Sequence, residues 1–195
     1  WSQQPEQART IHLHNSNTPI YRIEGEANKL LIGTWGEGIK VYDKEQERIY
    51  PLPGTEHLGT TFINAIYKDS RGFMWFGTAA GLARYDGYRF KVFRSTDNGS
   101  ASLPDNYIEK IVEDSEGRLW IRTGENGYVI YNWDTESFVC DVRSRMWDIG
   151  IDGTPRYVFV DKQKNTWFAI DGKGCYCYRP GEKNAVSLPF GEKGI

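Results

Sequence analysis

The sequence predicts an all-β fold built from four consecutive copies of a four-stranded antiparallel unit. The first observation is a block with the pattern I-x-x-I-x-x-D-x-x-G-x-x-W-x-G-T-x-x-G-L-x-x-Y, which is clearest over Ile63–Tyr85. The block returns 45 residues later over Ile108–Tyr131, a third copy ends at Tyr178, and a worn copy spans Ile20–Tyr42. The second observation is that period itself, because a fixed spacing of about 40–50 residues is the signature of a repeat architecture.

Each repeat contains four short segments that favour β-strands. In the clearest copy, Ile63–Tyr67, Phe73–Gly77 and Gly81–Tyr85 are apolar at nearly every position, so both faces of these strands are expected to be buried. Asp69–Gly72 provides a turn, since Asp can bond its own backbone and Gly accepts a left-handed conformation. Tyr88–Phe93 alternates aromatic and basic residues, as expected of a half-exposed outer strand.

A helix is the alternative for the first segment of a repeat. Ile108, Ile111 and Val112 stand at helical spacing in NYIEKIVED. We favour a strand because the equivalent segments are rich in β-branched and aromatic residues and carry no helix caps. The inner strands are expected near Ile20–Glu24, Ile63–Tyr67, Ile108–Glu113 and Arg156–Val160.

A four-stranded unit of about 45 residues with regular aromatic positions is typical of a β-propeller blade. A single blade cannot bury both of its faces, so the tryptophan of the second strand is expected to pack between neighbouring blades. We interpret residues 1–9 as a leader or cloning remnant and residues 10–195 as part of a propeller. The blades are expected at about 20–53, 63–96, 108–143 and 155–190, within a larger ring that continues beyond the chain.

Composition and motifs argue against several functions. The net charge is −2 with both signs mixed, which gives no electrostatic footprint for nucleic acid. No catalytic nucleophile–base pattern and no metal-ligand spacing is present, so we expect no catalytic residue, no metal site and no cofactor. Gly33–Gly38 is glycine-rich but lacks the helix that would hold a phosphate group.

Candidate ligand-binding residues are those that the repeat does not explain. Trp35, Trp133 and Trp147 have no counterpart in the other copies. If the first strand of each blade runs from top to bottom, the connections between strands two and three share the top face with the connections between blades. Trp35, Asn126, Arg145 and Trp147 fall on that face, and aromatic, amide and guanidinium groups together suit a sugar. The alternative is that Trp35 and Trp147 fill gaps between blades.

Two segments resemble a known family. GFMWFGTAAGLARYDGYRF and SLPDNYIEKIVEDSEGRLWIRT are similar to the regulator-propeller repeats in the periplasmic sensor region of Bacteroides-type hybrid two-component systems, a resemblance that extends over about 20–190. The resemblance implies rings of about seven blades, followed in the family by a membrane helix, a histidine kinase, a receiver and a DNA-binding domain. Two departures could mark specialised blades: Arg122 replaces the Gly of the G-T pair, and Ala169-Ile170 replace both residues.

The resemblance implies a periplasmic sensor fragment that binds oligosaccharides and controls polysaccharide-utilisation genes. On this interpretation the chain is not itself an enzyme, contacts the membrane only through a segment downstream, and does not bind nucleic acid. Uncovered blade faces lead us to expect a homodimer. A protein-interaction scaffold and a glycan-active propeller enzyme remain the alternatives, since some glycosidases place carboxylate pairs on propellers.

Overall fold

The computed structural model describes residues 20–25, 28–96, 102–124 and 127–188 of the chain. It contains four separate antiparallel sheets of four strands each, and every sheet is formed by strands that are consecutive in the sequence. We number the sheets as blades 1 to 4: blade 1, β1 (Ile20–Gly25), β2 (Lys29–Thr34), β3 (Ile39–Asp43) and β4 (Arg48–Pro51); blade 2, β5 (Ile63–Lys68), β6 (Met74–Thr78), β7 (Gly81–Tyr85) and β8 (Phe90–Phe93); blade 3, β9 (Ile108–Glu113), β10 (Leu119–Thr123), β11 (Gly127–Asn132) and β12 (Ser137–Val139); blade 4, β13 (Pro155–Val160), β14 (Thr166–Ile170), β15 (Gly174–Tyr178) and β16 (Val186–Leu188).

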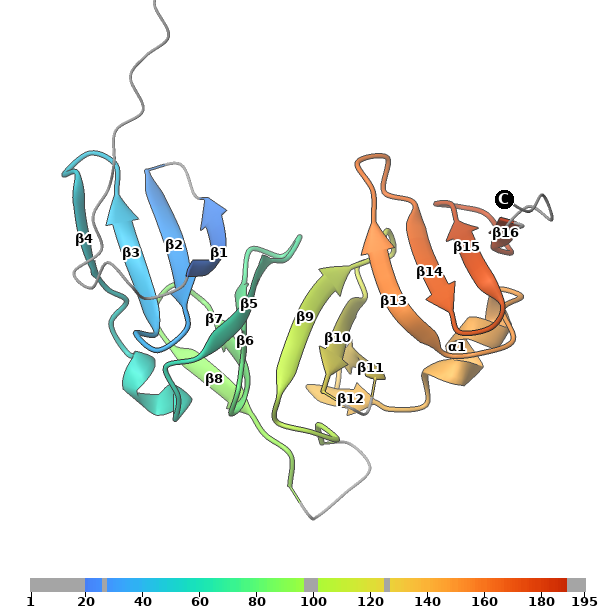
Figure 1. Ribbon diagram of the computed structural model, residues 1–195, viewed down its shortest axis with the longest axis horizontal. Helices are drawn as coiled ribbons and strands as arrows, with labels where there is room; N and C mark the ends of the chain where they lie inside the picture. Colours follow the sequence, from blue (N-terminus) through green and yellow to red (C-terminus); the bar gives the residue numbers. More distant parts are fainter. Residues whose placement is uncertain (1–19, 26–27, 97–101, 125–126, 189–195) are drawn as a thin grey trace, which may run out of the picture.

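The blades follow one another along an arc, with β1, β5, β9 and β13 at their inner edges (Figure 1). Each blade thus begins at the inside and ends at the outside, which is the arrangement of a β-propeller. The prediction of repeated four-stranded blades is confirmed. The residues for which a helix was the alternative form β9, so the strand interpretation of that segment is confirmed as well.

Two of the repeated tryptophans, Trp75 and Trp120, lie between blades, as expected. Trp75 is 0% exposed and belongs to an apolar cluster that joins blade 2 to Ile108, Ile111 and other residues of blade 3. Trp120 is 1% exposed and belongs to the cluster that joins blade 3 to blade 4. In both blades the tryptophan is on the face that the next blade covers, which we call the trailing face.

A hydrogen bond explains why Asp precedes Trp by six residues in the repeat. The indole Nε1 of Trp75 donates to Asp69 Oδ2 at 2.6 Å, and that of Trp120 donates to Asp114 Oδ2 at 2.8 Å. The second oxygen of Asp69 accepts from the backbone N–H groups of Arg71 and Phe73, each at 2.9 Å. One carboxylate therefore shapes the turn and also accepts the hydrogen bond of the buried indole. From the sequence, we had treated the turn and the tryptophan as separate features.

Blade 4 repeats this arrangement, and there the hydrogen bonds to the aspartate shift its pKa. The indole of Trp167 donates to Asp161 Oδ2 at 2.8 Å. This hydrogen bond, with those from Asn165 and Gln163, lowers the pKa of Asp161 below its ordinary value of 3.8. A carboxyl group whose pKa is lower in the folded state stabilises the fold above its unfolded pKa, and this contribution is lost as the pH falls through the folded pKa.

We therefore expect Asp161→Asn to lower the melting temperature near neutral pH, with a difference from wild type that shrinks below about pH 4. Thermal unfolding followed by circular dichroism across this range measures the effect. Asp134→Asn, at an exposed carboxylate in the turn between β11 and β12, is the matched control. A difference between wild type and Asp161→Asn that does not change with pH would contradict this account.

The structure corrects two expectations, one about a connection between blades and one about Trp133. We treated the segment before blade 4 only as a connection between blades on the ligand face, but it contains α1 (Val142–Asp148). Asp141 caps this helix by accepting a hydrogen bond from Ser144 N, while Val142 and Met146, four residues apart, are buried against blades 3 and 4. Trp133 was left unexplained by the repeat, yet it is a packing residue, because its ring lies edge-on to Tyr131 at 5.0 Å between centroids.

Candidate functional site

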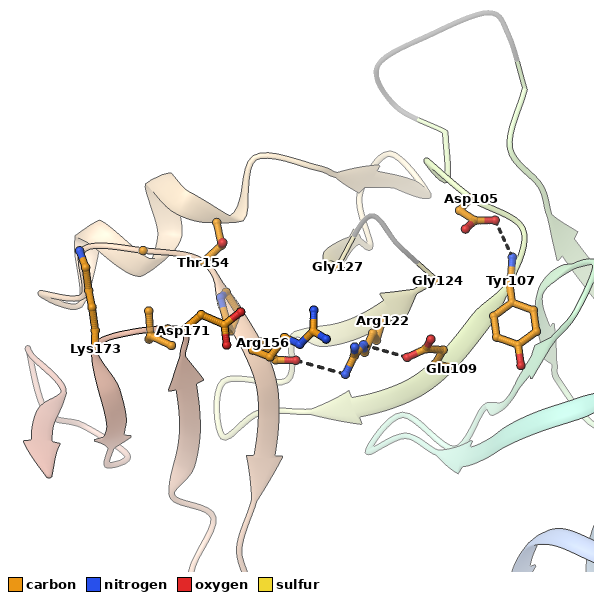
Figure 2. Close-up of a pocket in the computed structure, with 13 residues that line it drawn as sticks. Asp105, Tyr107, Glu109, Arg122, Gly124, Gly127, Thr154, Arg156, Asp171 and Lys173 are labelled. Carbon is orange, nitrogen blue, oxygen red and sulfur yellow. Dashed lines mark hydrogen bonds and ion pairs between the residues drawn. The ribbon is translucent and has the colours of Figure 1, made fainter. Parts of the chain in front are cut away.

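A cleft of about 990 Å³ lies between blades 3 and 4 (Figure 2). It is situated at the end of the strands where β10 turns into β11 and β14 turns into β15. This is the end that the sequence analysis predicted to carry the ligand site. The lining residues come from both blades and from the segments that lead into β9 and β13: Asp105, Tyr107, Glu109, Arg122, Gly124, Gly127, Gly153, Thr154, Pro155, Arg156, Ile170, Asp171 and Lys173.

The cleft lies where one blade departs from the repeat. In blades 1 and 2 the second strand has Gly33 and Gly77 before its terminal threonine, and the next blade packs directly on them. A Cβ added at Gly33 would lie 2.8 Å from Ile63 Cγ2, and one added at Gly77 would lie 2.8 Å from Ile108 Cγ2. These distances leave no space for a side chain. Blade 3 has Arg122 at this position, so blade 4 cannot pack on it in the same way.

Arg122 extends from β10 to the inner edge of β13. Its Nη1 donates to the carbonyl oxygen of Arg156 at 3.2 Å, and its guanidinium carbon lies 4.7 Å from the centre of the Tyr157 ring. Its Nε is 2.8 Å from Glu109 Oε2 in an ion pair that is not aligned as a hydrogen bond. The side chain is 12% exposed, and burial alone would lower its pKa, but Tyr157 and Glu109 outweigh burial and raise the pKa of Arg122.

The other charged groups of the cleft differ in whether another residue pairs with them. Figure 2 shows Arg122 and Arg156 in the middle, Glu109 and Tyr107 on one side, and Asp171 and Lys173 on the other. Lys173 Nζ is bound to Asp152, at 2.6 Å from Oδ2 and 2.7 Å from the carbonyl oxygen. Among the described residues, no acidic group accepts a hydrogen bond from the guanidinium of Arg156, which is exposed.

Glycine residues shape the wall formed by blade 3. A Cβ added at Gly124 would lie 2.6 Å from Asp105 Oδ2, so the absence of a side chain lets Asp105 lie against the backbone of blade 3. Thr123 Oγ1 donates to the carbonyl oxygen of Gly127 at 3.2 Å and holds the connection between β10 and β11. Gly127 has a φ of 77°, which favours glycine. A Cβ added at Gly127 would meet no atom within 4 Å, so the wall is open to a ligand at that residue.

The structure describes three of the four predicted ligand-binding residues, Trp35, Arg145 and Trp147, and does not bring these three together. Trp35 directly follows β2 at the expected end of blade 1, two blades from the cleft, where its ring lies edge-on to Phe62 at 5.7 Å. Arg145 and Trp147 are on α1. Arg145 Nη2 donates to Glu116 Oε1 at 3.1 Å, in the turn between β9 and β10 and thus at the opposite end of these strands from the cleft.

Trp147 is 66% exposed and Asn126 lies outside the described residues. Gly124 and Gly127, which flank Asn126 in the sequence, both line the cleft. Sequence reasoning missed Glu109 and Arg156 because both are in strands, where side chains are first attributed to packing. A signal was available in Arg122, since an arginine at a position that requires glycine in the neighbouring repeats indicates a local change of packing.

The residues that the structure describes hold neither a metal-ligand cluster nor a membrane-spanning helix. Within these residues, no group of three or more His, Cys, Asp or Glu side chains is placed to hold a metal ion. Likewise, no helix in the described part of the chain combines the length and the apolar character needed to cross a membrane.

Comparison with known proteins supports the fold and the type of repeat. A family model described as "Two component regulator propeller" matches residues 57–80 and 102–125. The extracellular domain described as that of the hybrid two component system BT3049 from B. thetaiotaomicron is 25% identical, with a TM-score of 0.51 over 80% of this chain and 19% of that chain. No curated protein sequence matches the chain.

A second structure, the extracellular domain described as that of the one component system BT4673 from the same organism, is 22% identical. Its TM-score is 0.61 over 89% of this chain and 24% of that chain. The chain thus spans 19% and 24% of the lengths of these two neighbours. Two segments of the chain therefore match the two-component regulator propeller model, one over β5 and β6 and one over β9 and β10, within four consecutive β-propeller blades.

Proposed function

We propose that the chain is a ligand-sensing, extracytoplasmic propeller region of a two-component sensor, with its signal passed to a histidine kinase carried elsewhere in the protein. The matched repeats and the likeness to an extracellular domain of a hybrid two-component system support this proposal. A sensor requires that ligand binding favour one of two conformations by a differential affinity, about 1–3 kcal/mol in typical allosteric proteins. Binding, and not turnover, is then the activity of this region.

The ligand in this proposal is an oligosaccharide bound in the cleft between blades 3 and 4. The observation that carries the proposal is Arg122, which replaces a packing glycine by a charged side chain and lies in the cleft wall. The cleft has a volume in the upper part of the range for small-molecule sites and is lined by donors and acceptors from both blades. The half-exposed ring of Tyr107 offers an apolar surface to the C–H face of a sugar.

The proposal makes no use of a cofactor, a metal ion or nucleic acid. A catalytic role would require a pair of carboxyl groups on either side of a scissile bond. Glu109 is already paired with Arg122, and its charge holds that guanidinium in place. We therefore assign Glu109 a positioning role in ligand binding.

We expect calorimetry to detect binding when the whole extracellular region is titrated with a panel of plant, host and microbial oligosaccharides. Arg122→Ala should weaken that binding at least tenfold, roughly the 1.4 kcal/mol that one good hydrogen-bonding group contributes. Arg89→Ala, which removes an exposed arginine from the turn between β7 and β8, is the matched control and should leave the affinity unchanged.

Two outcomes would contradict the proposal. If no oligosaccharide of the panel binds, a protein-interaction scaffold becomes the better interpretation. If product analysis shows that an oligosaccharide is cleaved, and a carboxylate of the cleft is essential for cleavage, the region is an enzyme.

A further inference from the structure

We propose that the ligand of the cleft between blades 3 and 4 carries a carboxylate group, as in a uronic acid, and that Arg156 binds it. This inference rests on the proposed function, because it specifies the chemistry of the ligand at the same site. Its basis is a pair of arginines in the middle of the cleft. Only one of the two, Arg122, has an acidic partner.

Arg122 is already neutralised. Its Nε is 2.8 Å from Glu109 Oε2, its Nη1 donates to the backbone of Arg156, and its side chain is largely buried. These contacts fix the guanidinium on the wall of the cleft. Its remaining N–H groups can donate to a hydroxyl group of a ligand, but its charge is already balanced by Glu109.

Arg156 is different. The hydrogen bond from Arg122 to its carbonyl oxygen places the two residues next to each other, so Arg156 adds a second positive charge beside the first. Its guanidinium is exposed, and the described residues supply no acidic partner for it. Lys173, the third cation of the lining, already has a partner in Asp152, so Arg156 is the cation of the cleft that a ligand anion would pair with. A negatively charged ligand group would balance the charge of Arg156, as Glu109 balances that of Arg122.

Geometry and the remaining lining residues favour a carboxylate on a sugar over an isolated anion. A guanidinium can donate two parallel hydrogen bonds to a planar carboxylate, and this geometry is stronger and more specific than a single contact. Asp105, Asp171 and Thr154 lie around the arginines and offer acceptors and a hydroxyl to neutral hydroxyl groups. The acidic residues also make the cleft unfavourable for ligands with several negative charges.

The test uses D-galacturonate and its methyl ester, which have the same hydroxyl groups and differ in the charge of one group. Each is titrated into the complete chain while NMR follows the side-chain Nε–H resonance of Arg156. We expect galacturonate to shift this resonance with a dissociation constant at least tenfold lower than that of the ester. Arg156→Gln, followed on the backbone resonances of Gly124 and Gly127, should reduce the affinity for galacturonate at least tenfold.

Lys162→Gln removes one exposed positive charge at the other end of β13 and should leave both affinities unchanged. Equal binding of acid and ester, or a galacturonate titration that leaves the Arg156 resonance unmoved, would overturn this inference. The proposed function would survive that result if a neutral oligosaccharide bound in a manner that depends on Arg122. Both the inference and the proposed function would fail if, in addition, no oligosaccharide of the panel bound.

Discussion

Replacing Trp75 with alanine is expected to lower the free energy of unfolding by about 3–5 kcal/mol, the usual range for a fully buried tryptophan. The ring stacks on Phe93 at 6.0 Å and lies edge-on to Tyr131 at 5.0 Å between centroids, so it joins two blades. The substitution empties that contact and also removes the indole donor of Asp69, which leaves a buried carboxylate without one of its partners. Both effects have the same sign.

Urea unfolding followed by tryptophan fluorescence and circular dichroism measures this loss. Trp147→Ala is the matched control, because the same substitution at a ring that is 66% exposed should change the stability by less than about 0.5 kcal/mol. Equal losses for the two variants would show that Trp75 does not hold blades 2 and 3 together.

The second large effect concerns self-association, and we propose that a second copy of the chain covers the trailing face of blade 4. The same face is buried by the next blade in blades 2 and 3. In blade 4 it carries Tyr157 and Phe159, which are 54% and 57% exposed, together with exposed Val186 and Leu188. An apolar sheet face of this kind drives association, and the repeat itself shows that a blade is the shape that fits it.

Analytical ultracentrifugation at tens of micromolar should therefore show dimers or larger species of the isolated chain. Phe159→Glu should shift the distribution to monomers, because it places a charge in the middle of the apolar face. Tyr88→Glu, at an aromatic residue that is 91% exposed in a turn of blade 2, should leave it unchanged. A wild-type chain that remains monomeric would contradict the proposal.

The sequence was sufficient to predict the blades because their determinants are local and repeated. The turn at Asp69–Gly72 and the apolar run before it recur with a constant spacing, and each blade is formed by four consecutive strands. Trp75 and Trp120 could be assigned to the interior because only the neighbouring blade can bury such a face. The bond between Asp69 and Trp75 was not foreseen, since a spacing of six residues has no evident meaning until the turn between two strands is built.

The candidate site could be predicted only in part. From the topology we expected ligand binding at the end of blades 3 and 4 where the cleft lies, but we also assigned every connection between blades to that end. Residues 142–148 instead fold into α1, and Arg145 bonds Glu116 at the other end of blade 3. Arg122 was recognised as a departure from the repeat, yet its consequence depends on Ile63 and Ile108 packing on glycine in the other blades, which is a contact between distant segments.

Hydrogen–deuterium exchange with and without a bound oligosaccharide tests most directly whether the cleft between blades 3 and 4 is the ligand site. The account predicts slower exchange confined to the two walls, in the peptides that contain Tyr107–Glu109, Arg122–Gly124 and Thr154–Arg156, with no change around Trp35. Protection around Trp35 or Trp147, with exchange in the cleft unchanged, would contradict it and would return the ligand site to the aromatic residues that the sequence first indicated.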